Sequence, residues 1–179
     1  MHLGKDTPGE VANNLRRPPR IRCHLAEFPG FVARAICVIS PSAEYKHLAG
    51  LKSLHTLSLH RTDITDLALI ELAGLKGMKE LWLSETEVTD AGIKSLVELK
   101  SLQSLWLHGT RVTDMGLKEM AGMTNLRSLV LSGTEVTDAG LKHLAGLKNL
   151  KSLWLNRTKV TAAGIAELKL ALPECKILD

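Results

Sequence analysis

Residues 102–117 read LQSLWLHGTRVTDMGL, and this pattern returns every 24 residues from Leu48 to Glu167. The period divides that part of the chain into five units without a gap: 48–71, 72–95, 96–119, 120–143 and 144–167. Five columns stay apolar in every unit, and in the first unit they are Leu54, Leu57, Leu59, Ile64 and Leu69. A unit of 24 residues is too short to bury its own apolar face, so we expect stacked units that share one continuous core.

Each unit combines a strand pattern with a helix pattern. The L-x-L element, such as Leu105 and Leu107, has the period of two that places both side chains on one face of a strand. Further along the unit, Leu69 and Leu72 form an i, i+3 pair at helical spacing. Stacking aligns the strands in parallel, about 4.8 Å apart. The expected fold class is α/β: a right-handed βα solenoid with a curved parallel sheet on the concave face and short helices on the convex face.

Polar columns mark the turns of each unit. Threonine precedes every expected helix, and aspartate follows it in four units; the fifth has Ala162. We therefore predict that Thr caps the helix and that Asp is a favourable first-turn charge. The Thr column that starts at Thr62 lies just past the strand and predicts hydroxyl bonds to the backbone of the adjacent unit. Glycines at the helix ends (Gly50, Gly74, Gly122, Gly146) predict left-handed C-terminal residues.

These units resemble the leucine-rich-repeat family. The spacing L-x-x-L-x-L-x-x-(N/C/T)-x-L runs from Leu102 to Val112, and the V-T-D-x-G-L stretch is most similar to the cysteine-containing class and its bacterial relatives. The ladder residue is Thr instead of Asn or Cys, and the units are shorter than those typical of the eukaryotic class. The resemblance covers about three quarters of the chain. It is highly specific for the solenoid fold and weakly specific for function. Eukaryotic members often carry an F-box, which recruits a ubiquitin ligase. No F-box-like helical pattern precedes the repeats here, so this role is not implied.

The two ends of the chain depart from the repeat. Residues 1–30 contain four prolines and an arginine cluster, and we expect a loosely ordered basic leader. Residues 31–47 are expected to form a degenerate first unit, in which Ala33, Ile36 and Val38 replace the L-x-x-L-x-L leucines, and Ser40-Pro41 opens a helix. Residues 168–179 are expected to cap the far end: Pro173 stops the helix, and Cys175–Leu178 adds a last short strand. The leucine-rich-repeat domain is thus expected to span 31–179.

Composition excludes several classes of protein. The net charge is +4, but residues 48–179 hold sixteen Lys/Arg and fifteen Asp/Glu, which is not the balance of a nucleic-acid platform. The three cysteines are widely spaced, so neither a disulfide framework nor a zinc site is expected. No apolar run is long enough for a transmembrane helix, and the first 25 residues lack a secretory signal. These absences leave the compartment unassigned and favour the cytoplasm.

All three tryptophans of the chain fall in one column of the concave face. That column, between the two core leucines of each strand, reads Ser58, Trp82, Trp106, Val130, Trp154. Other concave candidates are the residues His60, His108, Arg61, Arg157, Glu80 and Glu85. An aromatic stripe with small polar neighbours and arginine at both ends has the composition of a binding hot spot. The alternatives are that Trp simply suits a strand and covers its neighbours, or that the stripe stacks on sugar rings.

We therefore predict a noncatalytic protein-binding module with an unidentified protein partner on the concave face. A carbohydrate- or envelope-binding protein and a targeting subunit for an enzyme on another chain are the alternatives. No paired carboxylates, activated nucleophile or phosphate-binding glycine loop indicates catalysis, and no cofactor is expected. His60 and His108 share a column but lie two strands apart, about 10 Å, which is too far for one metal ion.

Overall fold

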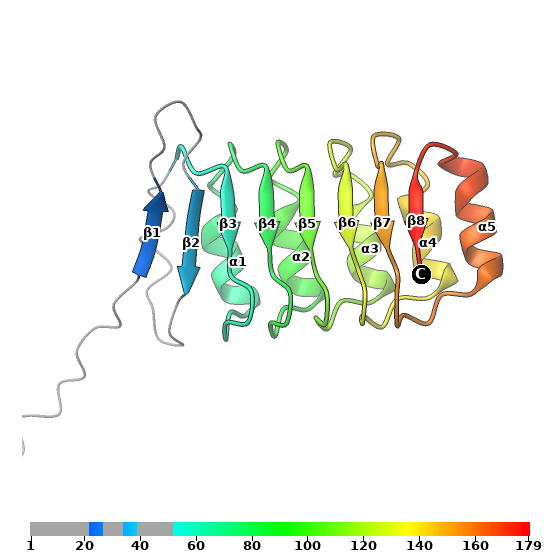
Figure 1. Cartoon of the computed structure of the whole chain (residues 1–179), viewed down its shortest axis with the longest axis horizontal. Coiled ribbons are helices and arrows are strands. Elements are labelled where there is room, and N and C mark those ends of the chain that lie inside the picture. Colours follow the sequence, from blue (N-terminus) through cyan, green and yellow to red (C-terminus); the bar gives the residue numbers. More distant parts are fainter. Residues whose placement is uncertain (1–21, 27–33, 39–51) are drawn as a thin grey trace, which may run out of the picture.

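The computed structural model describes residues 22–26, 34–38 and 52–179, which form an α/β solenoid (Figure 1). Eight strands lie side by side in one sheet in the order of the sequence, β1 to β8. The five helices lie along one face of this sheet, each packed on the next. The opposite face of the sheet is the concave face predicted from the repeat. The elements follow one another with the following bounds: β1 Arg22–Ala26, β2 Arg34–Val38, β3 Thr56–Ser58, α1 Asp66–Leu72, β4 Glu80–Trp82, α2 Asp90–Leu96, β5 Ser104–Trp106, α3 Asp114–Met120, β6 Ser128–Val130, α4 Asp138–Leu144, β7 Ser152–Trp154, α5 Ala162–Ala171 and β8 Lys176–Leu178.

The predicted columns form one continuous core between the sheet and the helices. Leu57, Leu81, Leu105, Leu129 and Leu153 are all fully buried, and they pair strand by strand from β3 to β7. The other apolar columns join the same cluster, except that in the last unit Ile165 is slightly more exposed and Val160 is only partly buried against the cluster. Parallel register at a constant offset of 24 residues therefore carries each leucine onto the leucine of the next unit.

The N-terminal strands differ from the expectation in two ways. Residues 1–30 were expected to be loosely ordered, but Arg22–Ala26 within this range forms β1 and pairs antiparallel with β2. β2 pairs parallel with β3, but Ala35 is opposite Leu57, where Ile36 was expected. The register of β2 on β3 therefore differs by one residue from the register expected for the degenerate unit. The predicted helix after Pro41 and the rest of the leader lie outside the described residues.

The turn after each strand corrects the predicted role of the Thr column. Each hydroxyl donates to a carbonyl three residues earlier in its own unit, as Thr110 does to the Leu107 oxygen at 2.7 Å. The adjacent unit is instead reached by backbone bonds, such as that from the Leu107 amide to the Val130 oxygen. A buried Thr, 4% exposed at Thr110, thus satisfies the carbonyl of the residue that directly follows its own strand.

The left-handed residues also lie elsewhere than predicted. Gly74, Gly122 and Gly146 do not adopt positive φ, and the helices end on αR residues such as Ala121. Positive φ occurs just past the strands, in the column Arg61 (55°), Glu85 (56°), Gly109 (65°), Gly133 (69°) and Arg157 (58°). The sharp turn out of the strand, and not the end of the helix, therefore requires the left-handed conformation.

The C-terminal end follows the sequence prediction. α5 ends at Ala171, before Pro173, and β8 adds one more parallel strand with Ile177 opposite Leu153. Cys175 is a free thiol and is 6% exposed, and burial raises its pKa. The cysteine thus acts as a small apolar residue in the core.

Candidate binding face

The three tryptophans form one stack across the concave face. The Trp82 and Trp106 rings on neighbouring strands have centroids 4.8 Å apart and planes inclined by 23°. The rings of Trp106 and Trp154 are also stacked, with centroids 6.3 Å apart and planes inclined by 25°. The predicted neighbours therefore pack together, and the stack extends to Trp154, which the sequence placed two strands away beyond Val130.

Val130 lies beneath this stack, between Trp106 and Trp154 on the sheet. It lies on β6 between the strands of Trp106 and Trp154, which would be about 9.6 Å apart at the usual strand spacing. Their ring centroids are closer than that, so the two rings lean toward each other across Val130, whose exposure is 7%. Trp82 at the outer end of the stack keeps 37% of its surface exposed.

A shallow hollow of about 450 Å³ opens beside the stack. It is lined by His60, Trp82, Ser84, Trp106, His108, Val130 and Ser132. Aromatic rings and a buried valine make its surface mainly apolar, with serine hydroxyls and imidazoles at the margin. The hollow therefore suits an apolar side chain of a partner better than a polar metabolite.

Both histidines are oriented by the backbone of the next unit. Nδ1 of His60 is 3.0 Å from the Ser84 carbonyl oxygen, and Nδ1 of His108 is 2.9 Å from that of Ser132. A carbonyl oxygen only accepts, so Nδ1 carries the proton in both rings and Nε2 is left for other contacts. The two imidazole rings are thus held in a fixed orientation at the edge of the hollow.

The charged candidates behave unequally. The guanidinium of Arg61 binds the carboxylate of Glu85 through two bonds, of 2.7 and 3.2 Å. Hydrogen bonding to Arg61 lowers the pKa of Glu85, and bonding to Glu85 raises that of Arg61. Arg61 and Glu85 thus neutralise each other's charge at the N-terminal end of the concave face. Arg157, at the C-terminal end, makes no ion pair within the described part of the chain. Glu80 lies on β4 beside the stack.

The convex side contains a polar joint that the sequence interpretation missed. The Asp90 carboxylate of one unit accepts from both the amide (2.8 Å) and the hydroxyl (2.7 Å) of Thr113 in the next. The same hydroxyl accepts from the Met115 amide and so caps α3, as predicted for Thr. The joint occurs four times: Asp66–Thr89, Asp90–Thr113, Asp114–Thr137 and Asp138–Thr161. The aspartates therefore link successive units as well as lying in the first helical turn.

Glycine completes this joint. A Cβ at Gly116 would lie 2.5 Å from Oδ1 of Asp90, so only glycine leaves room for the carboxylate. The sequence contained this signal: Asp occurs in units one to four and this Gly in units two to five, with Ala68 and Ala162 at the unpaired ends. Complementary losses at opposite ends of a repeat indicate a contact between one unit and the next.

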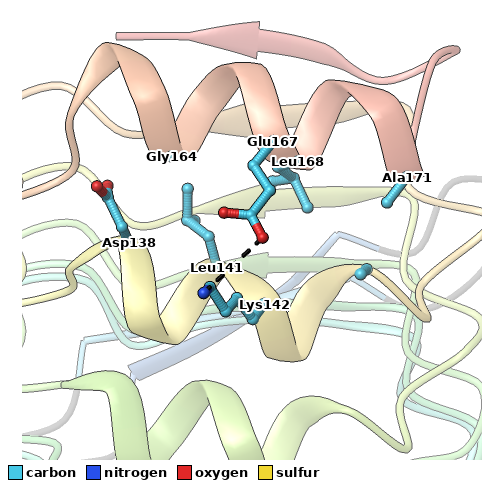
Figure 2. A pocket seen from close by; sticks show the side chains of 8 residues that line it. Asp138, Leu141, Lys142, Gly164, Glu167, Leu168 and Ala171 are labelled. Carbon is cyan, nitrogen blue, oxygen red and sulfur yellow. Dashed lines mark ion pairs between the residues drawn. The ribbon is translucent and has the colours of Figure 1, made fainter.

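Figure 2 shows the last joint, where Asp138 at the start of α4 faces Gly164 of α5. A second hollow of about 210 Å³ lies between these two helices, and an ion pair between Lys142 and Glu167 crosses it at 3.8 Å. Its remaining lining includes Leu141, Leu168 and Ala171. This hollow is a gap between packed helices.

Within residues 22–26, 34–38 and 52–179, no cluster of three His, Cys, Asp or Glu side chains is arranged to hold a metal ion. Across the same residues, none of the helices has both the length and the apolarity needed to span a bilayer.

Comparisons with known proteins agree with the repeat. A family model described as leucine-rich repeats (2 copies) matches residues 124–167. No curated protein is significantly similar in sequence to this chain. Among solved structures, an internalin from Listeria monocytogenes is 22% identical with a TM-score of 0.63, and the match covers 75% of this chain and 37% of that one.

Two further structures show the same relationship. A leucine-rich-repeat protein from Leptospira interrogans is 29% identical with a TM-score of 0.60, over 74% of this chain and 33% of that one. Internalin C2 from Listeria monocytogenes is 25% identical with a TM-score of 0.60, over 79% and 69%. This chain spans about a third of the length of the first internalin and of the Leptospira protein. The repeat, the parallel sheet with helices on one face and these similarities show a leucine-rich-repeat solenoid fold, and residues 124–167 match the leucine-rich-repeat family itself.

Proposed function

We propose that this protein binds a protein partner on its concave face, through the Trp stack formed by Trp82, Trp106 and Trp154. Solenoids of this kind present extended concave surfaces that commonly mediate protein–protein interaction. The observation that carries the proposal is the gathering of all three tryptophans of the chain into one half-exposed stack beside an apolar hollow. Trp is enriched among the residues that dominate binding energy at protein interfaces.

The stack geometry favours a protein over a carbohydrate. A sugar ring packs against the face of an aromatic ring, but both faces of Trp106 are directed at its neighbours. The apolar hollow lies beside these rings, and an apolar side chain of a partner fits into it. An enzyme on another chain is one kind of partner that such a face would hold, and the targeting role is therefore a special case of this proposal.

The test compares two triple variants of the full chain as bait in an extract of the source cells. One carries Trp82→Ala, Trp106→Ala and Trp154→Ala. Its matched control carries Leu67→Ala, Met115→Ala and Leu170→Ala, which remove exposed apolar side chains from the helices. We expect wild type and control to capture the same partner and the Trp variant to lose it, while circular dichroism shows all three folded.

Unchanged capture by a folded Trp variant would rule out the proposed face. A glycan array with wild type and Trp106→Ala separates the carbohydrate alternative. Strong sugar binding that disappears with Trp106 would replace the protein-partner proposal.

A further inference from the structure

Charge is unevenly distributed along the concave face. The strands β5 to β8 with their flanking residues, 103–109, 127–133, 151–157 and 175–179, contain four basic residues and one acidic residue, Asp179. The four are Arg127, Lys151, Arg157 and Lys176. The corresponding segment of the second unit, 79–85, contains Lys79 with Glu80 and Glu85. The C-terminal half of the concave face is therefore basic, and the N-terminal half is close to neutral.

The basic residues lie around the end of the Trp stack. Lys176 is opposite Ser152 in the register of β7 and β8, so it lies on the same face as Trp154. Arg127 and Lys151 directly precede β6 and β7, and Arg157 follows β7 at its other end. All four side chains are exposed. Cations thus flank Val130 and Trp154 at both ends of the strands.

These cations lack internal counter-charges. Some other exposed basic residues have partners: Arg61 pairs with Glu85, Arg111 with Glu87 and Lys159 with Glu135. None of Arg127, Lys151, Arg157 or Lys176 forms an ion pair with any residue that the structure describes. Their charge is thus available to a partner, and they surround an apolar centre.

The Trp geometry narrows the chemistry of that partner. An aromatic ring has a negative face and a positive edge. The rings of Trp106 and Trp154 are stacked with their faces toward each other, so we infer that a partner meets their edges. Edges favour carboxylate and carbonyl oxygens, and also the faces of other aromatic rings. Nucleobases instead bind single-strand platforms by stacking on ring faces, which this stack largely covers.

We propose that the partner of the concave face is an acidic polypeptide segment, in which Asp or Glu side chains flank an aromatic or aliphatic anchor. The anchor occupies the hollow beside Trp106, and the carboxylates meet Arg127, Lys151, Arg157 and Lys176. This inference rests on the proposed function, because it names the chemistry of the segment bound at the same Trp stack.

The test begins with the full chain and a phage library of random 12-residue peptides, so that charge is selected and not assumed. The clones kept are those whose binding is lost with Trp106→Ala. We expect these to be enriched in Asp and Glu together with aromatic or aliphatic residues, relative to the unselected library. The peptide from the strongest clone, labelled with fluorescein, is then titrated by fluorescence polarisation.

Two matched variants separate charge from fold. Arg127→Glu, Lys151→Glu and Lys176→Glu together are expected to weaken the peptide at least tenfold. Lys94→Glu, Lys118→Glu and Lys169→Glu, which reverse exposed lysines on helices, are expected to leave binding unchanged. Raising the salt concentration should weaken binding to wild type and have little effect on the remaining binding to the first variant.

The outcomes distinguish the two proposals. Trp106-dependent clones that are neutral or basic, or a charge-reversed variant that binds as wild type does, would overturn the acidic partner and leave the binding face standing. A selection without any Trp106-dependent clone would overturn both. A 12-nucleotide oligouridine that binds more tightly than the peptide, and is lost with the same charge reversal, would assign the face to single-stranded nucleic acid instead.

Discussion

The two sides of this solenoid use the same 24-residue repeat in opposite ways. On the convex side, the Asp–Thr joint and its glycine occur four times with nearly identical distances, and every partner lies within the chain. On the concave side, the equivalent column changes from Ser58 to Trp82, Trp106, Val130 and Trp154, and all of its side chains except that of Val130 remain partly exposed. Regular contacts between neighbouring units stabilise the stack, whereas the irregular column carries the surface that differs from a generic repeat.

The largest expected loss of stability comes from filling the glycine space in the joint. In Gly116→Ala, the new Cβ meets Oδ1 of Asp90, which two hydrogen bonds from Thr113 hold in place, and the side chain of Val112 at 2.8 Å. We expect the free energy of unfolding to fall by about 1–3 kcal/mol, as in other overpacked sites. Urea denaturation measures it. Gly122→Ala is the control, since nothing lies within 4 Å of its Cβ position, and an equal loss there would refute the steric reason.

Removing the carboxylate should cost less. Asp114→Ala leaves the amide and hydroxyl of Thr137 without their acceptor, and we expect a loss of about 1 kcal/mol in the free energy of unfolding. The reverse change, Ala162→Asp, introduces a carboxylate in the last unit, where no following Thr exists within the repeat. It should leave the urea midpoint nearly unchanged. If Ala162→Asp stabilised the protein by as much as Asp114→Ala destabilises it, Asp would act only as a first-turn charge.

A smaller effect, of opposite sign, is expected at the turn of the fifth unit. Arg157 has φ 58°, whereas the third and fourth units place glycine in this column. Arg157→Gly relieves the strain of a side chain in the left-handed conformation, which stabilises the folded state by about 1 kcal/mol. It also adds chain entropy to the unfolded state, which destabilises the fold by about 0.4–1 kcal/mol. We expect a net gain of up to about 0.5 kcal/mol, measured by urea denaturation, with weaker binding of the acidic peptide. A clear loss of stability would show that Arg157 has a structural role.

The smallest expected effect is on the acid limb of the stability profile. Hydrogen bonds from the hydroxyl and then the amide of Thr161 lower the pKa of Asp138 below its ordinary value of 3.8. A carboxyl with a lowered pKa in the folded state contributes stability above 3.8 and loses it as the pH falls through the folded value. Urea midpoints between pH 7 and pH 2.5 should therefore fall less steeply at the acid end for Asp138→Asn than for wild type. Parallel profiles would contradict the assignment.

The repeat itself was predictable because its signals are local or strictly periodic. Leu57 and Leu59 alternate, Leu69 and Leu72 follow helical spacing, and a constant period of 24 residues carries each onto the next unit. The first unit was predicted less well, because its strand obeys a different offset and Ala35, not Ile36, is opposite Leu57. Where the period fails, the sequence alone does not determine which residues of neighbouring strands are paired.

By itself, the sequence determined that units stack, which residues form the core, where the helices begin and that the tryptophans share one column. Tertiary structure decided what those side chains meet. Trp106 and Trp154 lean together across Val130, Arg61 is engaged by Glu85, and each Asp reaches the Thr of the following unit. The physical reason is that periodicity sets the positions of backbone atoms. Contacts across units depend on side-chain rotamers and on the space that neighbouring residues leave.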